Sequence, residues 1–347
     1  MKKITALALA IITLLFTVSC SGDPDGTIEL SVGVVDNADE AVMSYDGKEL
    51  SSGMYAFIFS YLKSWNLYYL QYYGSADYVD DTERFWNIDT GNGTYGENTV
   101  RDINDHCKML LICEKLAADY GVTLDSEEKE LVEGELNDFI SAYGSEGKLS
   151  EFLVRYGITV DDLEAYLEKK HLVNAVQDEL CAESGLCEVK KTEVYDAIAK
   201  EYRKVTHLYL LDSDYNGDAT AKAKEIADAV NGGKALSEYK GLSKDNMYTA
   251  YPDGEIVELA GCVEEYAKLA EGLKAGECGY CKVGEGAYVM LGFDMTDSDK
   301  DSKYETVYAG IANERFLAAM ADRYGLVELN STELAKYDII TADTIDF

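Results

Sequence analysis

The sequence predicts an α+β protein in which a mainly helical part is interrupted by a part built on an antiparallel sheet. Two observations predict this class. Apolar residues recur at helical spacing from about residue 58 to residue 202, and again from 303 to 324. Between residues 204 and 294 the pattern is instead strand, helix, loop, helix, strand. With 347 residues, 47% of them hydrophobic, the chain is long enough to build two cores.

The N-terminus has the pattern of a secretory signal. Lys2 and Lys3 precede an apolar run over residues 4–18, which is too short to span a bilayer. The run ends in TVSC at 17–20, which resembles a lipoprotein cleavage box and predicts lipidation of Cys20. A plain signal peptide cut near Ser19 is the alternative. We therefore expect a signal peptide over residues 1–19, a lipidated tether over 20–37, and a protein held at a bacterial membrane outside the cytoplasm by its acyl chains.

The chain is strongly acidic. It has 31 Lys and Arg against 65 Asp and Glu, a net charge of −34, or −36 once Lys2 and Lys3 leave with the signal. Nucleic-acid binding needs a basic surface, so this balance argues against a nucleic-acid partner. It also argues against docking of the protein body on anionic lipid. A high negative charge does keep a protein in solution when it binds aggregation-prone partners.

The helical part is rich in aromatic residues. One stripe at steps of three and four predicts a helix with a buried face, and its members are Ile58, Leu62, Trp65, Tyr69 and Tyr72. Tyr61 and Tyr68 lie off this stripe, where tyrosine offers apolar area and a polar tip to a partner. Further helices are predicted over residues 98–120, 126–143, 148–156, 160–180 and 191–202, with a long C-terminal helix over 303–324.

Eight cysteines in an exported chain normally indicate disulfides. Setting Cys20 aside leaves seven, so at least one is free or pairs outside the chain. Cys278 and Cys281 form a C-x-x-C motif between a helix end and a strand, which favours a local bridge or two inert thiols over redox catalysis. Cys181 and Cys187 flank a predicted interhelical turn and are placed to pair.

No metal site is predicted. His106, His171 and His207 have no second ligand at zinc spacing except the adjacent His106 and Cys107. Two acidic runs, at 212–218 and 297–301, imitate calcium loops. Both lack the glutamate expected at the twelfth position and are interpreted as solvated acidic loops.

Short stretches between residues 204 and 294 match the motifs of one enzyme family in their order along the chain. They are 205–211 (VTHLYLL), 219–230 as a helix ended by NGG, 236–239 (LSEY), 242–245 (LSKD), 262–266 (CVEEY), 273–277 (LKAGE) and 286–290 (GAYVM). This set resembles a parvulin-type prolyl isomerase over about ninety residues.

The rest of the chain resembles the SurA and PrsA type of extracytoplasmic foldase. Segment 42–51 (VMSYDGKELS) resembles the entry segment of that family. Two further stretches, 117–124 (AADYGVTL) and 156–163 (YGITVDDL), resemble its helical segments. The resemblance implies a helical chaperone domain over residues 38–200 and an inserted parvulin-like antiparallel-sheet domain over 201–296. It also implies that residues 297–347 pack back on the helical domain.

The resemblance places five residues in an isomerase site. His207 and Tyr288 would form its base, Asp245 would occupy the variable acid position, and Cys262 and Tyr266 would take the proline-holding places of Met and Phe. Tyr288 stands where the family has its second histidine, so His207 is expected to lack its usual partner. No cofactor is implied, because turning an X-Pro bond against a barrier of about 18–20 kcal/mol requires only stabilisation of the twisted amide.

The sequence thus predicts a membrane-anchored chaperone or foldase that binds unfolded exported polypeptides and carries a divergent prolyl isomerase domain. The alternative is a fully active parvulin-type peptidyl-prolyl isomerase of the same architecture. A solute-binding lipoprotein is disfavoured because no alternating βαβ pattern is present.

Overall fold

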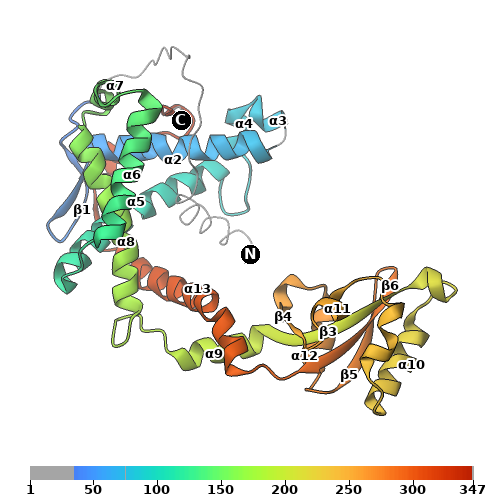
Figure 1. Ribbon diagram of the computed structural model, residues 1–347. Helices are drawn as coiled ribbons and strands as arrows, with labels where there is room; N and C mark the ends of the chain where they lie inside the picture. Colours follow the sequence, from blue (N-terminus) through green and yellow to red (C-terminus); the bar gives the residue numbers. More distant parts are fainter. Residues whose placement is uncertain (1–34, 75, 346–347) are drawn as a thin grey trace. The chain divides into compact units, whose positions relative to one another are not determined.

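The computed structural model describes residues 35–74 and 76–345 and divides into two compact units (Figure 1). The helical unit contains the chain up to Cys187 and again from Arg315, whereas the sheet unit contains Glu188–Glu314. Each unit combines helices with a small antiparallel sheet. The predicted α+β class is therefore confirmed. The predictions for residues 1–34, including the lipidation of Cys20, concern residues outside the described part of the chain.

The sheet of the helical unit begins with a tight hairpin. Strand β1 (Ala41–Tyr45) turns into β2 (Lys48–Ser51), and β7 (Glu328–Leu329) pairs with the other edge of β1, which gives the order β2-β1-β7. The turn residues Asp46 and Gly47 both have positive φ angles, 46° and 82°. Aspartate followed by glycine favours a turn in which both central residues have positive φ, and the twist of such a turn matches that of the flanking strands.

Helices make up most of this unit. They are α2 (Ser52–Tyr73), α3 (Ala76–Val79), α4 (Thr82–Trp86), α5 (Tyr95–Tyr120), α6 (Ser126–Tyr143), α7 (Glu146–Leu153), α8 (Val160–Cys181) and α14 (Ser331–Leu334). Local sequence explains their ends. Asp125 and Glu128 form a reciprocal capping box at the start of α6, and Gly144, with φ of 81°, ends it. The predicted bounds of α6 are confirmed, whereas α5 begins three residues earlier than predicted because Thr94 caps it.

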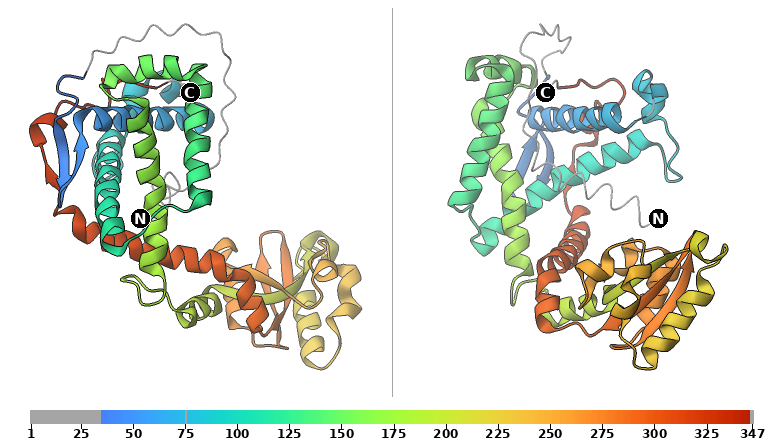
Figure 2. Two further views of the ribbon diagram at one scale, coloured as in Figure 1. Left: turned by 60° about the vertical axis from the view of Figure 1, so that its left-hand side comes forward. Right: turned by 45° about the vertical axis from the view of Figure 1, so that its right-hand side comes forward.

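Aromatic side chains fill the core of the helical unit. The ring of Phe57 on α2 is fully buried and contacts those of Tyr61, Phe139, Tyr156 and Tyr166. Helix α8 packs against both α5 and α6 (Figure 2). Rings from three other segments, carrying Phe139, Tyr156 and Tyr166, therefore converge on α2.

The sheet unit has four antiparallel strands in the order β4-β3-β6-β5. Its elements are α9 (Lys191–Glu201), β3 (Tyr202–Leu211), α10 (Thr220–Asn231), α11 (Met247–Ala250), β4 (Glu255–Glu258), α12 (Glu264–Gly272), β5 (Cys278–Val283) and β6 (Gly286–Phe293). Tyr202, predicted as the end of a helix, is instead the first residue of β3.

Alternation along β3 gives this sheet two different faces. Leu208 and Leu210 point toward α10, where they pack on Ile226 and other buried residues. Val205 lies on the opposite face and packs with Tyr266 of α12 and Met290 of β6. Because successive side chains alternate, His207 shares the face of Val205 and α12.

Helix α13 (Asp297–Tyr324) begins in the sheet unit and ends in the helical unit. It starts six residues before the predicted start at 303, because Thr296 and Asp299 cap each other's backbone N–H groups. The acidic run 297–301 is therefore the first turns of a helix, and its interpretation as a solvated loop was wrong. Asp299 also accepts from Lys204 at 3.0 Å.

None of the helices within residues 35–74 and 76–345 combines the length and the apolar character needed to cross a membrane.

Candidate functional site

His207 is the centre of a hydrogen-bonded cluster on the α12 face of the sheet. Its Nδ1 atom lies 2.9 Å from the hydroxyl oxygen of Tyr266, and its Nε2 atom lies 2.9 Å from a carboxylate oxygen of Asp245. The imidazole is 12% exposed and the Asp245 side chain 32%. Tyr288, and not a second histidine, lies beside His207, and both ring nitrogens of His207 are engaged by other side chains.

The loop that carries Asp245 is fastened to the end of β3. The Ser243 hydroxyl accepts the N–H of Tyr209 and donates to the second carboxylate oxygen of Asp245, each at 2.9 Å. The N–H of Lys244 donates to the carbonyl of Tyr209 at 2.8 Å. These bonds hold the carboxylate opposite the imidazole.

The carboxylate of Asp245 is held in its ionised form. Burial by itself would raise its pKa, but the hydrogen bond and the charge of His207, with the Ser243 hydroxyl, outweigh burial and lower the pKa below its usual value. An ionised carboxylate only accepts, so Nε2 of His207 carries the proton. In neutral His207 the Nδ1 atom then accepts from the Tyr266 hydroxyl, which burial keeps protonated by raising its pKa.

Tyr288 completes an aromatic wall around the imidazole. Its ring lies edge-on to His207 at 4.8 Å and edge-on to Tyr266 at 5.1 Å, and the ring of Tyr209 lies 4.8 Å from it. Burial raises the pKa of Tyr288, so its hydroxyl remains a donor. Among the described residues that hydroxyl has no hydrogen-bond partner.

Cys262 lies beside this cluster without joining its hydrogen bonds. It precedes α12 and packs against the group of Val205, Tyr266 and Met290. Its thiol donates to the carbonyl of Glu258 at 3.3 Å, and burial raises its pKa. Such a thiol is a poor nucleophile, and its contacts are those of a packing residue.

The structure thus brings together four predicted side chains, His207, Asp245, Tyr266 and Tyr288, with Cys262 at their edge. The sequence analysis did not predict Tyr209 as part of the cluster, nor the hydrogen bonds by which Ser243 holds Asp245 in place. The period-two alternation of β3, which puts Tyr209 on the face of His207, was the available signal for Tyr209.

No disulfide joins any of the seven cysteines outside the N-terminal segment. Cys181 and Cys187, which were placed to pair, share a hydrogen bond and not a disulfide. Cys278 packs on the α10 face, and Cys281, three residues later on the same strand, points to the other face. A local bridge between them is therefore excluded by the geometry of β5. Burial raises the pKa of Cys278 to about 12 and that of Cys281 to about 11, so both thiols are unreactive.

Within the described residues no three metal-ligating side chains lie together. The acidic run at 212–218 has structural partners of its own. Asp212 pairs with Lys282 and accepts the N–H of Ala219 at 2.9 Å, and Asp218 accepts the N–H of Thr220 at 2.8 Å. These contacts hold the loop that leads into α10.

A second candidate surface is an aromatic ladder along α2, made of Phe57, Tyr61, Trp65, Tyr69 and Tyr73. Successive rings are four residues apart, with centroid separations of 6.0–6.3 Å. Phe57 is fully buried, whereas Tyr73 is 84% exposed. Burial thus decreases from the start of α2 to its end, and it does not divide the helix into a buried face and an exposed face. The placement of Tyr61 on a partner-facing side was wrong, since it is buried, and Tyr72 of the predicted buried stripe is 67% exposed.

No protein-family model matches this chain, and no curated protein matches it. It is similar to several solved structures. A peptidylprolyl isomerase (PrsA) from Bacillus cereus is 16% identical, with 75% of this chain and 92% of that one covered and a TM-score of 0.33. The foldase protein PrsA from Streptococcus pneumoniae is 15% identical, with 86% and 93% covered and a TM-score of 0.30. The foldase protein PrsA from Lactococcus lactis is 14% identical, with 88% and 100% covered and a TM-score of 0.32.

Proposed function

We propose that this protein is an extracytoplasmic foldase, anchored to a bacterial membrane through Cys20, that binds unfolded exported polypeptides with its helical unit. The observation that carries this proposal is the exposed end of the aromatic ladder. Tyr72 and Tyr73, at 67% and 84% exposure, continue a contiguous set of rings that begins in the core.

Tyrosine suits recognition of many different unfolded chains. Its ring supplies apolar contact area, its hydroxyl accepts or donates a hydrogen bond, and few rotamers are lost on binding. The exposed rings are supported from below, because Tyr68 lies 4.8 Å from Tyr72, and Tyr69 lies 6.2 Å from Tyr73. A partner therefore meets rings that already contact neighbouring rings. The net charge of −34 keeps such an apolar surface soluble.

The test is suppression of aggregation of an unfolded client by the chain and by a Tyr72→Ser, Tyr73→Ser double variant. We expect the apparent affinity to fall roughly tenfold, the effect of losing about 1.4 kcal/mol of binding free energy at two anchors. The matched control is Tyr120→Ser with Tyr251→Ser, which removes two tyrosines that are 50% and 45% exposed elsewhere. Equal affinity of both double variants would place the client surface away from α2.

Prolyl isomerisation is the second candidate function, and the cluster around His207 favours it. The hydroxyl of Tyr288, which has no hydrogen-bond partner among the described residues, stands beside a polar cluster fixed by Asp245 and Tyr266. A twisted X-Pro amide loses its resonance, and an oriented donor beside it stabilises that state more than the planar one. The additional hydroxyl of Tyr266 and the small Cys262 make this pocket more polar and looser than the family pattern. We therefore assign it weak activity.

A further inference from the structure

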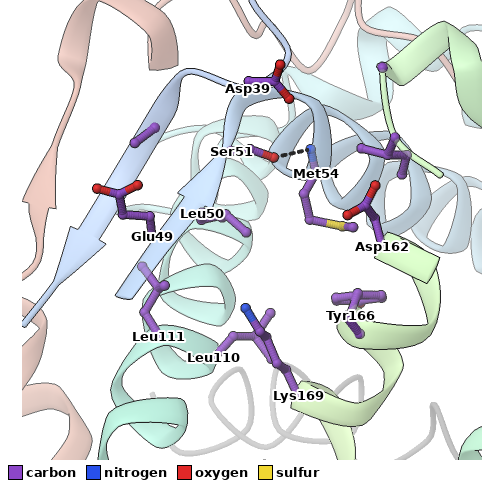
Figure 3. A pocket seen from close by; sticks show the side chains of 14 residues that line it. Asp39, Glu49, Leu50, Ser51, Met54, Leu110, Leu111, Asp162, Tyr166 and Lys169 are labelled. Atoms are coloured by element: carbon purple, nitrogen blue, oxygen red, sulfur yellow. Dashed lines mark hydrogen bonds between the residues drawn. The ribbon is translucent and has the colours of Figure 1, made fainter. Parts of the chain in front are cut away.

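The helical unit contains a pocket away from the aromatic ladder's exposed end. It has a volume of about 280 Å³ and lies between β2, the first turn of α2, and helices α5 and α8 (Figure 3). Its apolar floor includes Leu50, Met54, Leu110 and Tyr166. Pockets that enclose whole drug-sized ligands measure about 300–1,000 Å³, so this one is suited to a single side chain.

Carboxylates surround the apolar floor. Asp39, Glu49 and Asp162 line the pocket, and Figure 3 shows them on three sides of it. Asp162 is committed to the start of α8, where it accepts the N–H and the hydroxyl of Thr159 at 2.8 and 2.7 Å. Asp39 and Glu49 have no hydrogen-bond or ion-pair partner within the described part of the chain, so both are available to a ligand.

The positive charge at the pocket is already paired. Lys169 is the one cationic side chain among the described residues that line it, and its Nζ atom lies 2.8 Å from a carboxylate oxygen of Glu114. Glu114 also accepts from Lys48 at 3.1 Å, and these two lysines lower its pKa against the opposing effect of burial. The lining thus keeps a surplus of negative charge above an apolar floor.

This combination is complementary to one kind of side chain. Lysine and arginine carry a cation at the end of an apolar stem, and they bury the stem while the charged end stays at the polar rim. A ligand that is simply apolar would leave the two carboxylates unused, and an anionic ligand would be repelled by them. The overall negative charge of the chain also favours encounter with basic polypeptides.

We propose that this pocket receives a lysine or arginine side chain of a bound unfolded polypeptide. The inference rests on the proposed foldase function and specifies its client class as polypeptides with basic residues near apolar ones. In this arrangement the stem lies on Leu50 and Met54 while the charged end meets Glu49 and Asp39.

The test uses the full chain and two labelled unfolded peptides that differ at one position, lysine in one and norleucine in the other. Fluorescence anisotropy gives the affinity for each. The pocket variant is Asp39→Asn with Glu49→Gln, and the control is Glu130→Gln with Glu133→Gln, which removes the same charge from exposed positions on α6. We expect the native chain to prefer the lysine peptide about three- to tenfold, the control to keep this preference and the pocket variant to lose it.

Three outcomes would overturn the proposal in distinguishable ways. An equal loss of preference in the pocket variant and the control would mean that the overall charge, and not the pocket, selects the client. If the pocket variant keeps its thermal stability and still prefers the lysine peptide, the pocket is not the site that binds the basic side chain. That result would not contradict the foldase function. Failure of the native chain to bind either peptide would reject the foldase function, and the pocket's proposed role with it.

Discussion

The hydroxyl of Tyr266 lies 2.9 Å from Nδ1 of His207, although the two residues are 59 positions apart in sequence. Tyr266 bonds one ring nitrogen of His207, and Asp245 bonds the other. The ring of Tyr288 packs edge-on against the same imidazole at 4.8 Å. The cluster is therefore fully bonded around His207.

Replacing Tyr266 with Phe should destabilise the sheet unit. The change removes the donor to Nδ1 of neutral His207 and leaves a buried acceptor unpaired, so the free energy of unfolding should fall by about 0.5–1.5 kcal/mol. Denaturant unfolding of the full chain measures it. Tyr280→Phe on β5, where the ring is 36% exposed, is the control and should change little. Identical midpoints for Tyr266→Phe and Tyr280→Phe would contradict the importance of this bond.

Asp245 should make the stability of the sheet unit depend on acid pH. Its pKa in the folded protein lies below its usual value, so the folded state binds fewer protons than the unfolded state. The stabilisation is thus complete above the unfolded pKa of about 3.9 and is lost as pH falls through the lower folded value. Asp245→Asn should have a lower free energy of unfolding than the native chain at pH 7, and the difference between the two should be smaller at pH 3. Exposed Asp253→Asn, the control, should have the same free energy of unfolding as the native chain at both pH values.

His207→Ala should change isomerisation of a proline peptide by little, whereas Tyr288→His should raise it. The reason is that the site is divergent and its imidazole is already engaged on both sides by Tyr266 and Asp245. The measurement is kcat/KM, with thermal stability checked for each variant. Loss of a transition-state interaction costs about 10²-fold, or about 2.7 kcal/mol. A high native rate that collapses by that factor in stable His207→Ala would make isomerisation the leading function.

Phe57→Ala should strongly destabilise the helical unit. Phe57 is fully buried and contacts four other rings, so the substitution leaves a cavity and should lower the free energy of unfolding by about 3–5 kcal/mol. Tyr73→Ser at the exposed end of the same ladder should stay within about 0.5 kcal/mol of the native chain. Denaturant unfolding compares them, and similar losses in both would mean that the ladder is not graded from core to surface.

Cys20→Ser should release the protein from the membrane or leave its precursor uncut. The prediction follows from the apolar run that ends at Ser19 and Cys20. Membrane fractionation and N-terminal sequencing check it, with Cys281→Ser as a control that should stay anchored. Native protein found free in the medium, beginning at a residue other than 20, would show that the segment is a plain signal peptide.

Features with local causes could be predicted from the order of the residues. Asp125, Glu128 and Gly144 mark both ends of α6, because capping and left-handed backbone depend on neighbouring residues. Alternation along β3 likewise assigns His207 to the face opposite Leu208. The predicted bounds of α6 therefore agree with the structure, and the face of His207 follows from a local pattern in the sequence.

Features that depend on residues far apart in sequence became visible only in the folded chain. The pattern of α2 could not reveal that burial changes along its length, because Phe139, Tyr156 and Tyr166 cover its first half and not its last turn. Nor could it reveal that the hydroxyl of Tyr266 bonds His207, since packing of α12 on β3 creates that contact. A hydrogen bond needs its two atoms within about 3 Å, and for residues 59 positions apart only the folded chain fixes that distance.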